Sequence, residues 1–232
     1  MNGPTGKVGP VKPSDLPLLN TVSAPTLSAD GSLAVFAVTR PDLRADASVG
    51  QLWQVRTDGS APAERLTRGF RDTDPRLSPD GRLLAFLRAT PGGPSQLQVV
   101  RAAGGEPVPV TDQVLGVTAF DWSPDGRRLV FCSRVPEHGR YGTVPGLPPA
   151  AEPARRITTT RYLANGVGVV TDRRSQVFLV EVPDVAAEPP VPAAPSAEEP
   201  EPAATAAVPT PSSSPVRRPT TATRGSGATP PP

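Results

Sequence analysis

The sequence predicts an all-β protein: a partial β-propeller of about three four-stranded blades, followed by a disordered tail rich in Pro and Ala. Three observations lead to this prediction. A short turn phrase occurs three times at a nearly constant spacing. Apolar segments of strand length lie on both sides of it. All Phe, Trp and Tyr residues lie between Phe36 and Phe178, which confines the core to one stretch of the chain.

The repeated phrase occupies residues 28–31, 78–81 and 123–126, and reads Ser-Ala-Asp-Gly once and Ser-Pro-Asp-Gly twice. Successive copies are 50 and 45 residues apart, close to the roughly 40 to 45 residues of one propeller blade. Proline fixes φ at the second position of a type I turn, Asp bonds nearby backbone amides, and Gly accepts a positive φ. Each phrase therefore predicts a hairpin loop between the first and second strands of one unit.

The other strands of each unit are expected in chain order. The first strand ends at the phrase in the second and third units, over residues 74–77 and 119–122. Second strands follow the phrase at 33–36, 82–87 and 127–133. Third strands begin with Gln at 51–55, 96–100 and 176–180. Short fourth strands are expected in the first two units, at 64–67 and 107–111.

The third unit is stretched by an insert that runs from Arg134 to about Arg174. It contains a proline-rich loop and a hairpin-like segment, 162–170, whose Asn165-Gly166 pair is a strong type I′ turn signal. The predicted domains are a flexible N-terminus (1–19), the partial propeller (20–182) and a disordered tail rich in Pro, Ala, Ser and Thr (183–232).

Charge and cysteine content argue against several functions. The net charge is +2 and basic residues occur in pairs at most, so no nucleic-acid footprint is expected. The single Cys132 indicates a reducing compartment, and no Cys/His pattern predicts a metal or another cofactor. The first thirty residues lack the apolar run of about 7 to 15 residues that a signal peptide needs, and no apolar stretch is long enough to span a membrane. We expect a soluble, cytoplasmic protein.

No catalytic, cofactor-binding or metal-binding residue is predicted. Asp30, Asp80 and Asp125 recur, but each lies in a turn where its expected role is local backbone bonding rather than catalysis. His138 is expected to be a solvated loop histidine; the alternative is a contact with a hydrolase domain. Cys132 is expected to be an inert strand thiol.

Three further motifs have a plain and a functional interpretation. The arginine pairs that begin at Arg155 and Arg173 are expected to be solvated hairpin charges; otherwise they face a peptide carboxylate or a domain interface. Residues 165–168 (Asn-Gly-Val-Gly) form a turn rather than a phosphate loop, because no Lys-Ser/Thr and no helix follow them. The Pro189-x-x-Pro192 spacing suits an SH3-type groove, but such spacings also arise by chance in any proline-rich sequence.

The repeats resemble the TolB-like (PD40) propeller repeat, and more narrowly the N-terminal propeller of the prolyl oligopeptidase (S9) serine peptidases, especially the acylaminoacyl-peptidase-like group. The narrower resemblance rests on residues 155–158 (Arg-Arg-Ile-Thr), 161–162 (Arg-Tyr), 165–168 and 172–174 (Asp-Arg-Arg), which lead into the strand 176–180. It covers about residues 20–182 and implies a propeller that precedes an α/β-hydrolase domain carrying Ser, Asp and His. Here the resemblance stops at Val182, no Gly-x-Ser-x-Gly elbow is present, and His138 is the only histidine.

The resemblance implies a non-catalytic propeller that limits the access of substrates to a peptidase, truncated before the catalytic domain. The expected partners are then a peptide substrate or a hydrolase domain on another chain. The alternative is a propeller-type protein–protein interaction module with a disordered tether. In either case the open edges of three blades predict self-association. An enzyme active on its own is disfavoured because the sequence offers no triad.

Overall fold

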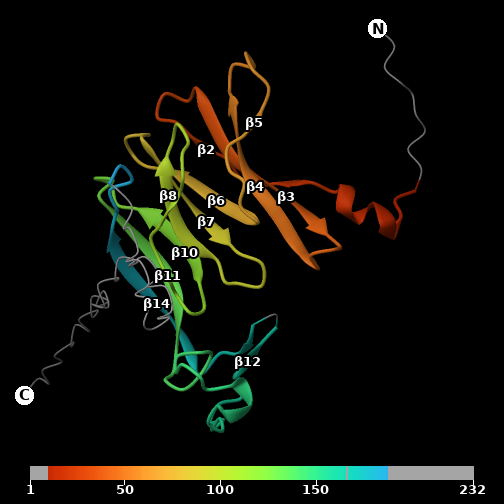
Figure 1. Cartoon of the computed structure of the whole chain (residues 1–232), viewed down its shortest axis with the longest axis vertical. Helices are drawn as coiled ribbons and strands as arrows, with labels where there is room; N and C mark the ends of the chain where they lie inside the picture. The colour runs from red at the N-terminus through yellow and green to blue at the C-terminus, as the bar shows by residue number, and fades with distance from the viewer. Residues whose placement is uncertain (1–9, 166, 188–232) are drawn as a thin grey trace, which may run out of the picture.

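The computed structural model describes residues 10–165 and 167–187, and these form strands with only two short 3-10 helices. Three antiparallel blades follow one another along the chain (Figure 1). The all-β, propeller-type prediction is confirmed. Within the stretch predicted as a flexible N-terminus, Pro13–Leu18 form the helix η1. Residues 188–232 of the predicted tail lie outside the described residues.

Blade 1 is an antiparallel meander in which two long strands are flanked by very short ones. Its strands are β2 (Thr26–Leu27), β3 (Leu33–Asp42), β4 (Ala47–Arg56) and β5 (Glu64–Arg65). The additional strand β1 (Thr21–Val22) pairs with β3 farther along the same edge as β2. The predicted third and fourth strands of this unit are confirmed as β4 and β5.

Blade 2 repeats this order. Its strands are β6 (Arg71–Leu77), β7 (Leu83–Ala89), β8 (Gln96–Arg101) and β9 (Val108–Pro109). Each strand is antiparallel to the next. Blades 1 and 2 are joined as a sheet by one parallel pair alone, Gly50 with Arg71. The strand pairing between the two blades is thus limited to this one pair, and the rest of their contact is made by side chains packed between them.

Blade 3 contains three strands within the described residues: β10 (Val117–Trp122), β11 (Arg128–Pro136) and β14 (Arg173–Glu181). The insert between β11 and β14 holds the short helix η2 (Pro149–Ala151) and the hairpin of β12 (Leu163–Ala164) and β13 (Gly168–Val169). The predicted stretching of the third unit and its hairpin are thus confirmed.

All three turn phrases adopt the same structure, shown here for blade 2. The Ser78 hydroxyl donates a hydrogen bond to Asp80 Oδ1 (2.6 Å) and accepts one from the Leu83 amide (2.9 Å). Asp80 Oδ1 also accepts the Arg82 amide (3.1 Å), and Gly81 has a φ of +70°. The same Ser–Asp and Asp–amide bonds occur in the other two copies. The recurring carboxylates are therefore structural, as predicted.

The core lies between the blades rather than within one of them. On the side of β7 that faces blade 1, Leu84 and Phe86 pack with Val35 and Leu52. On its other side, Ala85 and Leu87 pack in a second cluster with residues of blade 3 such as Phe131. Successive side chains of a strand point to opposite faces. Both faces of β7 are thus covered, which explains its nearly uninterrupted apolar sequence.

The first strands of successive blades are also in contact. The Leu77 amide of β6 donates a hydrogen bond to Thr26 Oγ1 of β2 (3.2 Å). The Trp122 indole of β10 donates one to the carbonyl of Arg76 in β6 (3.0 Å). The first strands thus lie side by side at the inner edge of the stack, as they do around a propeller axis.

We expect the free energy of unfolding to fall as the pH drops from about 4 to about 2. The Ser28 hydroxyl, followed by bonds from Ser32, lowers the pKa of Asp30 to about 2. The Ser78 and Ser123 hydroxyls likewise lower the pKa of Asp80 and of Asp125. A carboxyl group whose pKa is lower in the folded state contributes stability above its unfolded pKa and loses it as the pH falls through the folded value. Urea unfolding across this pH range measures the effect.

The matched variant carries Ala in place of the three turn serines, Ser28, Ser78 and Ser123. It should lose part of the pH dependence, because its turn carboxylates no longer accept a hydroxyl hydrogen bond. Replacing the exposed Ser48 by Ala serves as the control and should leave the slope unchanged. A slope that is the same in the triple variant would show that other groups cause the acid sensitivity.

Candidate functional site

The insert, residues 137–172, is the largest departure from the repeat and the first candidate site. It connects the second and third strands of blade 3, β11 and β14. The equivalent connections in blades 1 and 2 are tight hairpin loops. In Figure 1 the insert lies at the lower end of the stack, beyond the end of β11. The insert therefore enlarges one end of the blade stack.

A buried guanidinium group anchors the insert. The side chain of Arg140 is only 6% exposed, and its Nε lies 3.6 Å from Asp172 Oδ2. Two further carboxylates, those of Glu137 and Glu152, each lie 3.8 Å from it. Arg140 Nη2 donates a hydrogen bond to the carbonyl of Ala154 (3.3 Å). One cation thus ties both ends of the insert and its middle together.

A second arginine completes the network. Arg155 Nε donates a hydrogen bond to Asp172 Oδ2 (2.6 Å), and its Nη2 contacts the Tyr141 hydroxyl (3.3 Å) and Glu152 Oε2 (3.4 Å). The Tyr141 hydroxyl donates a hydrogen bond to Asp172 Oδ1 (3.1 Å). We call Arg140, Tyr141, Glu152, Arg155 and Asp172 the insert cluster. Its charges are paired, so it fixes the shape of the insert.

Tyr141 is held in an unusual conformation. Its φ is +52°, in the left-handed region that is unfavourable for a bulky side chain. The guanidinium groups of Arg155 and Arg173 lie 5.7 Å and 4.7 Å from the centroid of its ring. Its amide also donates a hydrogen bond to Glu152 Oε1 (2.8 Å). The surrounding contacts therefore determine the backbone at Tyr141, as is common at sites where geometry matters.

The electrostatics of the insert cluster follow from this geometry. Burial raises the pKa of the Asp172 carboxyl group, but hydrogen bonds from Arg155 and Tyr141 outweigh burial and hold the pKa below its usual range. The hydrogen bond to Asp172 raises the pKa of Arg155 in turn. Both groups stay ionised at neutral pH. The cluster offers no free nucleophile or general base among its members.

One sequence prediction is corrected here. Arg155 and Arg173 were expected to be solvated charges of a hairpin, but both are engaged within the insert. Arg155 pairs with the buried Asp172, and Arg173 donates hydrogen bonds to the carbonyls of Val169 (2.6 Å) and Val167. The prediction was wrong because the insert folds back onto the beginning of β14. The second members of the pairs, Arg156 and Arg174, are exposed as expected.

The other candidate residues do not belong to the insert cluster. His138 is exposed in the insert. Cys132 is partly buried in β11 and is not in a disulfide. Residues Leu163 and Ala164 pair with Val169 and Gly168, so the Asn165 segment is a hairpin turn, as predicted. Sequence reasoning missed Arg140, Tyr141 and Glu152; the only local signal is a glycine on each side of the Arg140-Tyr141 pair.

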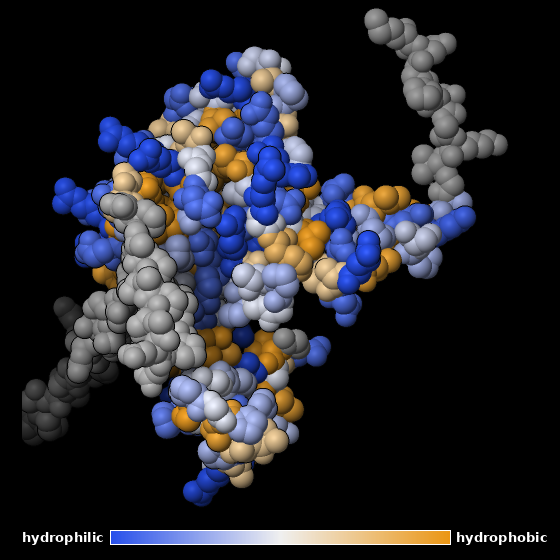
Figure 2. All heavy atoms as spheres, in the orientation of Figure 1, coloured by the Kyte–Doolittle hydropathy of each residue, from blue (hydrophilic) through white to orange (hydrophobic). Residues whose placement is uncertain are grey.

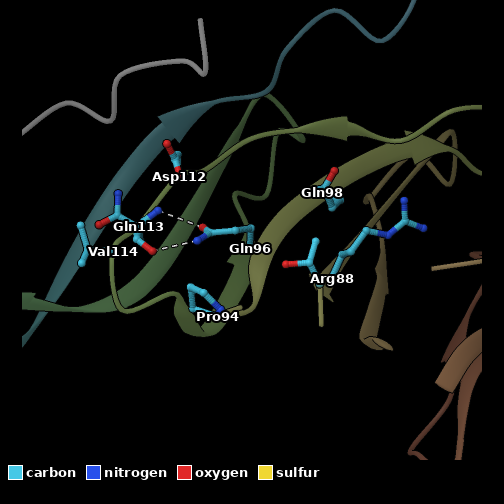
Figure 3. A pocket seen from close by; sticks show the side chains of 8 residues that line it. Arg88, Pro94, Gln96, Gln98, Asp112, Gln113 and Val114 are labelled. Atoms are coloured by element: carbon cyan, nitrogen blue, oxygen red, sulfur yellow. Dashed lines mark hydrogen bonds between the residues drawn. The ribbon is translucent and has the colours of Figure 1, made fainter. Parts of the chain in front are cut away.

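Blade 2 carries a second candidate, an open cavity of about 390 Å³ near the β7–β8 loop (Figure 3). Gln96 in its wall exchanges hydrogen bonds with the backbone of Gln113 (2.8 and 2.9 Å). Arg88, also in the wall, forms two hydrogen bonds with the fully buried Asp72 (2.8 and 2.9 Å). The side chains of Gln96 and Arg88 are therefore already engaged within blade 2.

Within residues 10–165 and 167–187, no three or more His, Cys, Asp or Glu side chains gather in a way that could hold a metal ion. No helix in these ranges has the length and apolarity needed to cross a membrane. Exposed apolar side chains do occur near the N-terminal arm that carries η1, where Figure 2 shows several.

Comparison with known proteins identifies relatives of this chain. Models of known protein families gave no match. The chain is 29% identical over 171 residues to the uncharacterized peptidase YuxL of Bacillus subtilis, which is 72% of this chain and 26% of that protein. It is 34% identical over 117 residues to dipeptidyl-peptidase 5 of Porphyromonas gingivalis, which is 50% of this chain and 17% of that protein.

A solved structure gives the fold. The acylaminoacyl peptidase of Pyrococcus horikoshii superimposes on 72% of this chain and 24% of its own with a TM-score of 0.56, at 14% identity. The chain thus spans about a quarter or less of the length of these proteins. The resemblance to the propeller of S9-type peptidases is confirmed. The chain is a propeller related to peptidases.

Replacing Arg155 by Ala should loosen the insert, whereas replacing its neighbour Arg156 should not. Loss of Arg155 removes the shortest ion pair of Asp172, a carboxylate that is only 5% exposed. Because Arg155 itself is 32% exposed, we expect a loss of about 1–2 kcal/mol in the free energy of unfolding. Arg156→Ala should stay within about 0.5 kcal/mol of the unchanged protein. Denaturant unfolding measures both, and equal losses would contradict the role of the cluster.

Proposed function

We propose that this chain is the non-catalytic, substrate-gating propeller of an S9-type serine peptidase, and that it limits access to a hydrolase domain. The observation that carries the proposal is the insert, a large element at one end of the blade stack that is anchored by buried ion pairs. The relatives of the chain are peptidases. An element that limits access to an active site must keep its shape when substrates contact it. Two buried or half-buried arginines on one buried carboxylate provide that rigidity.

The exposed part of the insert cluster suits contact with a peptide or a facing domain. Arg155 is one-third exposed and Arg173 stacks on Tyr141, so cationic and aromatic groups reach the surface together. Arg173 bonds to backbone carbonyls rather than to a carboxylate, so its oriented positive charge can still attract one. The proposed contacts are therefore the carboxyl groups of a peptide substrate or of the hydrolase domain.

The catalytic groups are proposed to come from outside these 232 residues. The sequence contains one histidine and no Gly-x-Ser-x-Gly elbow. His138 lies exposed on the insert, whereas the base of a serine triad is oriented by a carboxylate and lies within hydrogen-bond reach of the serine. The single cysteine supports the proposal of a cytoplasmic location for the protein.

The purified chain should be catalytically silent. It should not hydrolyse acyl-aminoacyl or dipeptidyl chromogenic substrates above the buffer rate, and a fluorophosphonate probe should label no serine, because no base activates one. The Bacillus peptidase treated in parallel provides the positive control for the probe. Labelling of any serine in this chain, located by mass spectrometry, would overturn the non-catalytic assignment.

The gating role makes a separate prediction. In a chimera, residues of this chain replace the matching segment of the Bacillus peptidase, and a second chimera also has residues 141–170 replaced by a short Gly-Ser turn. We expect the second chimera to cleave long polypeptides several-fold faster relative to dipeptides, because the insert no longer narrows the entrance.

A chimera with Arg156→Ala serves as the matched surface control and should keep the original ratio of long to short substrates. An unchanged ratio in the chimera without the insert would favour the interaction-module alternative over gating. The dipeptide rate reports whether each chimera is folded, since the dipeptide does not need the gate.

A further inference from the structure

The face of blade 2 that is turned toward blade 1 carries two open cavities, of about 390 and 360 Å³, whose walls share Arg88. Arg88 lies two residues after Phe86 in β7, and therefore on the face that packs against blade 1. The first cavity lies near the β7–β8 loop, and the second is walled by residues 66–69 of blade 1 and 105–107 of blade 2. A ligand that contacts both cavities must pass Arg88 and must therefore be extended rather than compact.

The first cavity contains a buried side-chain amide that has no partner. Gln98 is only 9% exposed, and its side chain lines this cavity (Figure 3). Within the part of the chain that the structure describes, neither Oε1 nor Nε2 of Gln98 makes a hydrogen bond, whereas the amide of Gln96 bonds to the backbone of Gln113. Buried polar groups are normally hydrogen-bonded. Gln98 thus holds an acceptor and donors that a ligand can use.

Arg88 adds an oriented donor to the same cavity. Its Nε and Nη2 donate hydrogen bonds to the fully buried Asp72, whereas its Nη1 makes none with the described residues. The hydrogen bonds to Asp72 raise the pKa of Arg88 against the opposing effect of burial, and the charge of Glu106 adds to the increase. The guanidinium group is therefore fixed and charged, its charge is balanced by Asp72, and one of its nitrogens is left for a ligand.

The two cavities differ in their other charges. Asp112 lines the first cavity, is exposed, and forms no ion pair with any described residue. In Figure 3 it lies apart from Arg88, on the side of Val114. The second cavity is lined by the exposed Arg68 and Glu106, whose charges are opposite. The first cavity therefore favours a ligand with a cationic group, and the second favours neither sign.

A peptide chain supplies the groups that this arrangement lacks. A peptide unit has one N–H donor and one C=O acceptor, which match the amide of Gln98, and a further carbonyl can accept a hydrogen bond from Arg88. Pro94 and Val114 provide apolar surface for its side chains. We propose that the two cavities bind an extended peptide segment, with its main chain on Gln98 and Arg88 and a cationic group at Asp112. That cation is a Lys or Arg side chain or an amino terminus.

Binding of a labelled peptide to the full chain tests the proposal. The probe is the acetylated hexapeptide Ala-Val-Lys-Ala-Val-Ala with a fluorophore at its C-terminus, and fluorescence anisotropy follows its binding. We expect a dissociation constant below about 1 mM. Gln98→Met keeps the size of the side chain but removes the amide, and should weaken binding about tenfold, the effect of the hydrogen bonds that are lost. Asp112→Asn should weaken it several-fold.

Gln176→Met and Asp46→Asn are the matched controls, because both residues are exposed and lie outside the two cavities. Both should leave the affinity unchanged. The urea midpoint of Gln98→Met should not fall, because the amide has no partner to lose. A probe with Glu in place of Lys should bind several-fold more weakly. A probe with a free amino terminus and no lysine shows which of the two cations the site prefers.

Three results contradict the proposal. The first is the absence of saturable binding of every probe up to about 5 mM. The second is unchanged affinity in both Gln98→Met and Asp112→Asn, and the third is an equal loss in Gln98→Met and Gln176→Met. The site uses no residue of the insert and the assay needs no hydrolase domain, so this proposal and the gating function stand or fall separately.

Discussion

Packing of blade on blade is the interaction on which the rest of the structure depends. The second strand of blade 2, β7, sends Leu84 and Phe86 to one neighbour and Ala85 and Leu87 to the other. No blade has a core of its own, since a single sheet cannot cover its own faces. The alternation of side chains along β7 therefore links all three blades into one cooperative stack. The insert cluster is positioned by this stack through β11 and β14.

Most of the fold could be predicted because it is encoded locally. The Ser-x-Asp-Gly turn uses side chains within five residues of one another, so its structure does not depend on the rest of the protein. Once the three turns are placed, strand lengths and the 45-residue period place the other strands. The hairpin around Asn165 was found for the same reason. Local turn chemistry and periodicity are thus the two signals that can be recognised in a single sequence.

The candidate site could not be predicted in this way, because it is held together over long sequence distances. Asp172 pairs with Arg140 and Arg155, which are 32 and 17 residues away. Nothing in the charge pattern distinguishes Arg155, which is paired, from Arg156, which is exposed. The insert also lacks the period that located the strands. Only the folding of the insert back onto β14 reveals which charges meet.

The hydrogen bonds within the turn phrase have a consequence for how the number of repeats can change during evolution. Every bond is made by Ser, Asp and the backbone, and the second residue contributes none, which is why Ala29 replaces Pro without changing the geometry. Each unit thus brings its own closing device and needs nothing from a neighbour to form its first hairpin. A duplicated or deleted unit of about 45 residues leaves the remaining turns intact. Gene duplication can therefore change the number of blades without redesign of the units that stay.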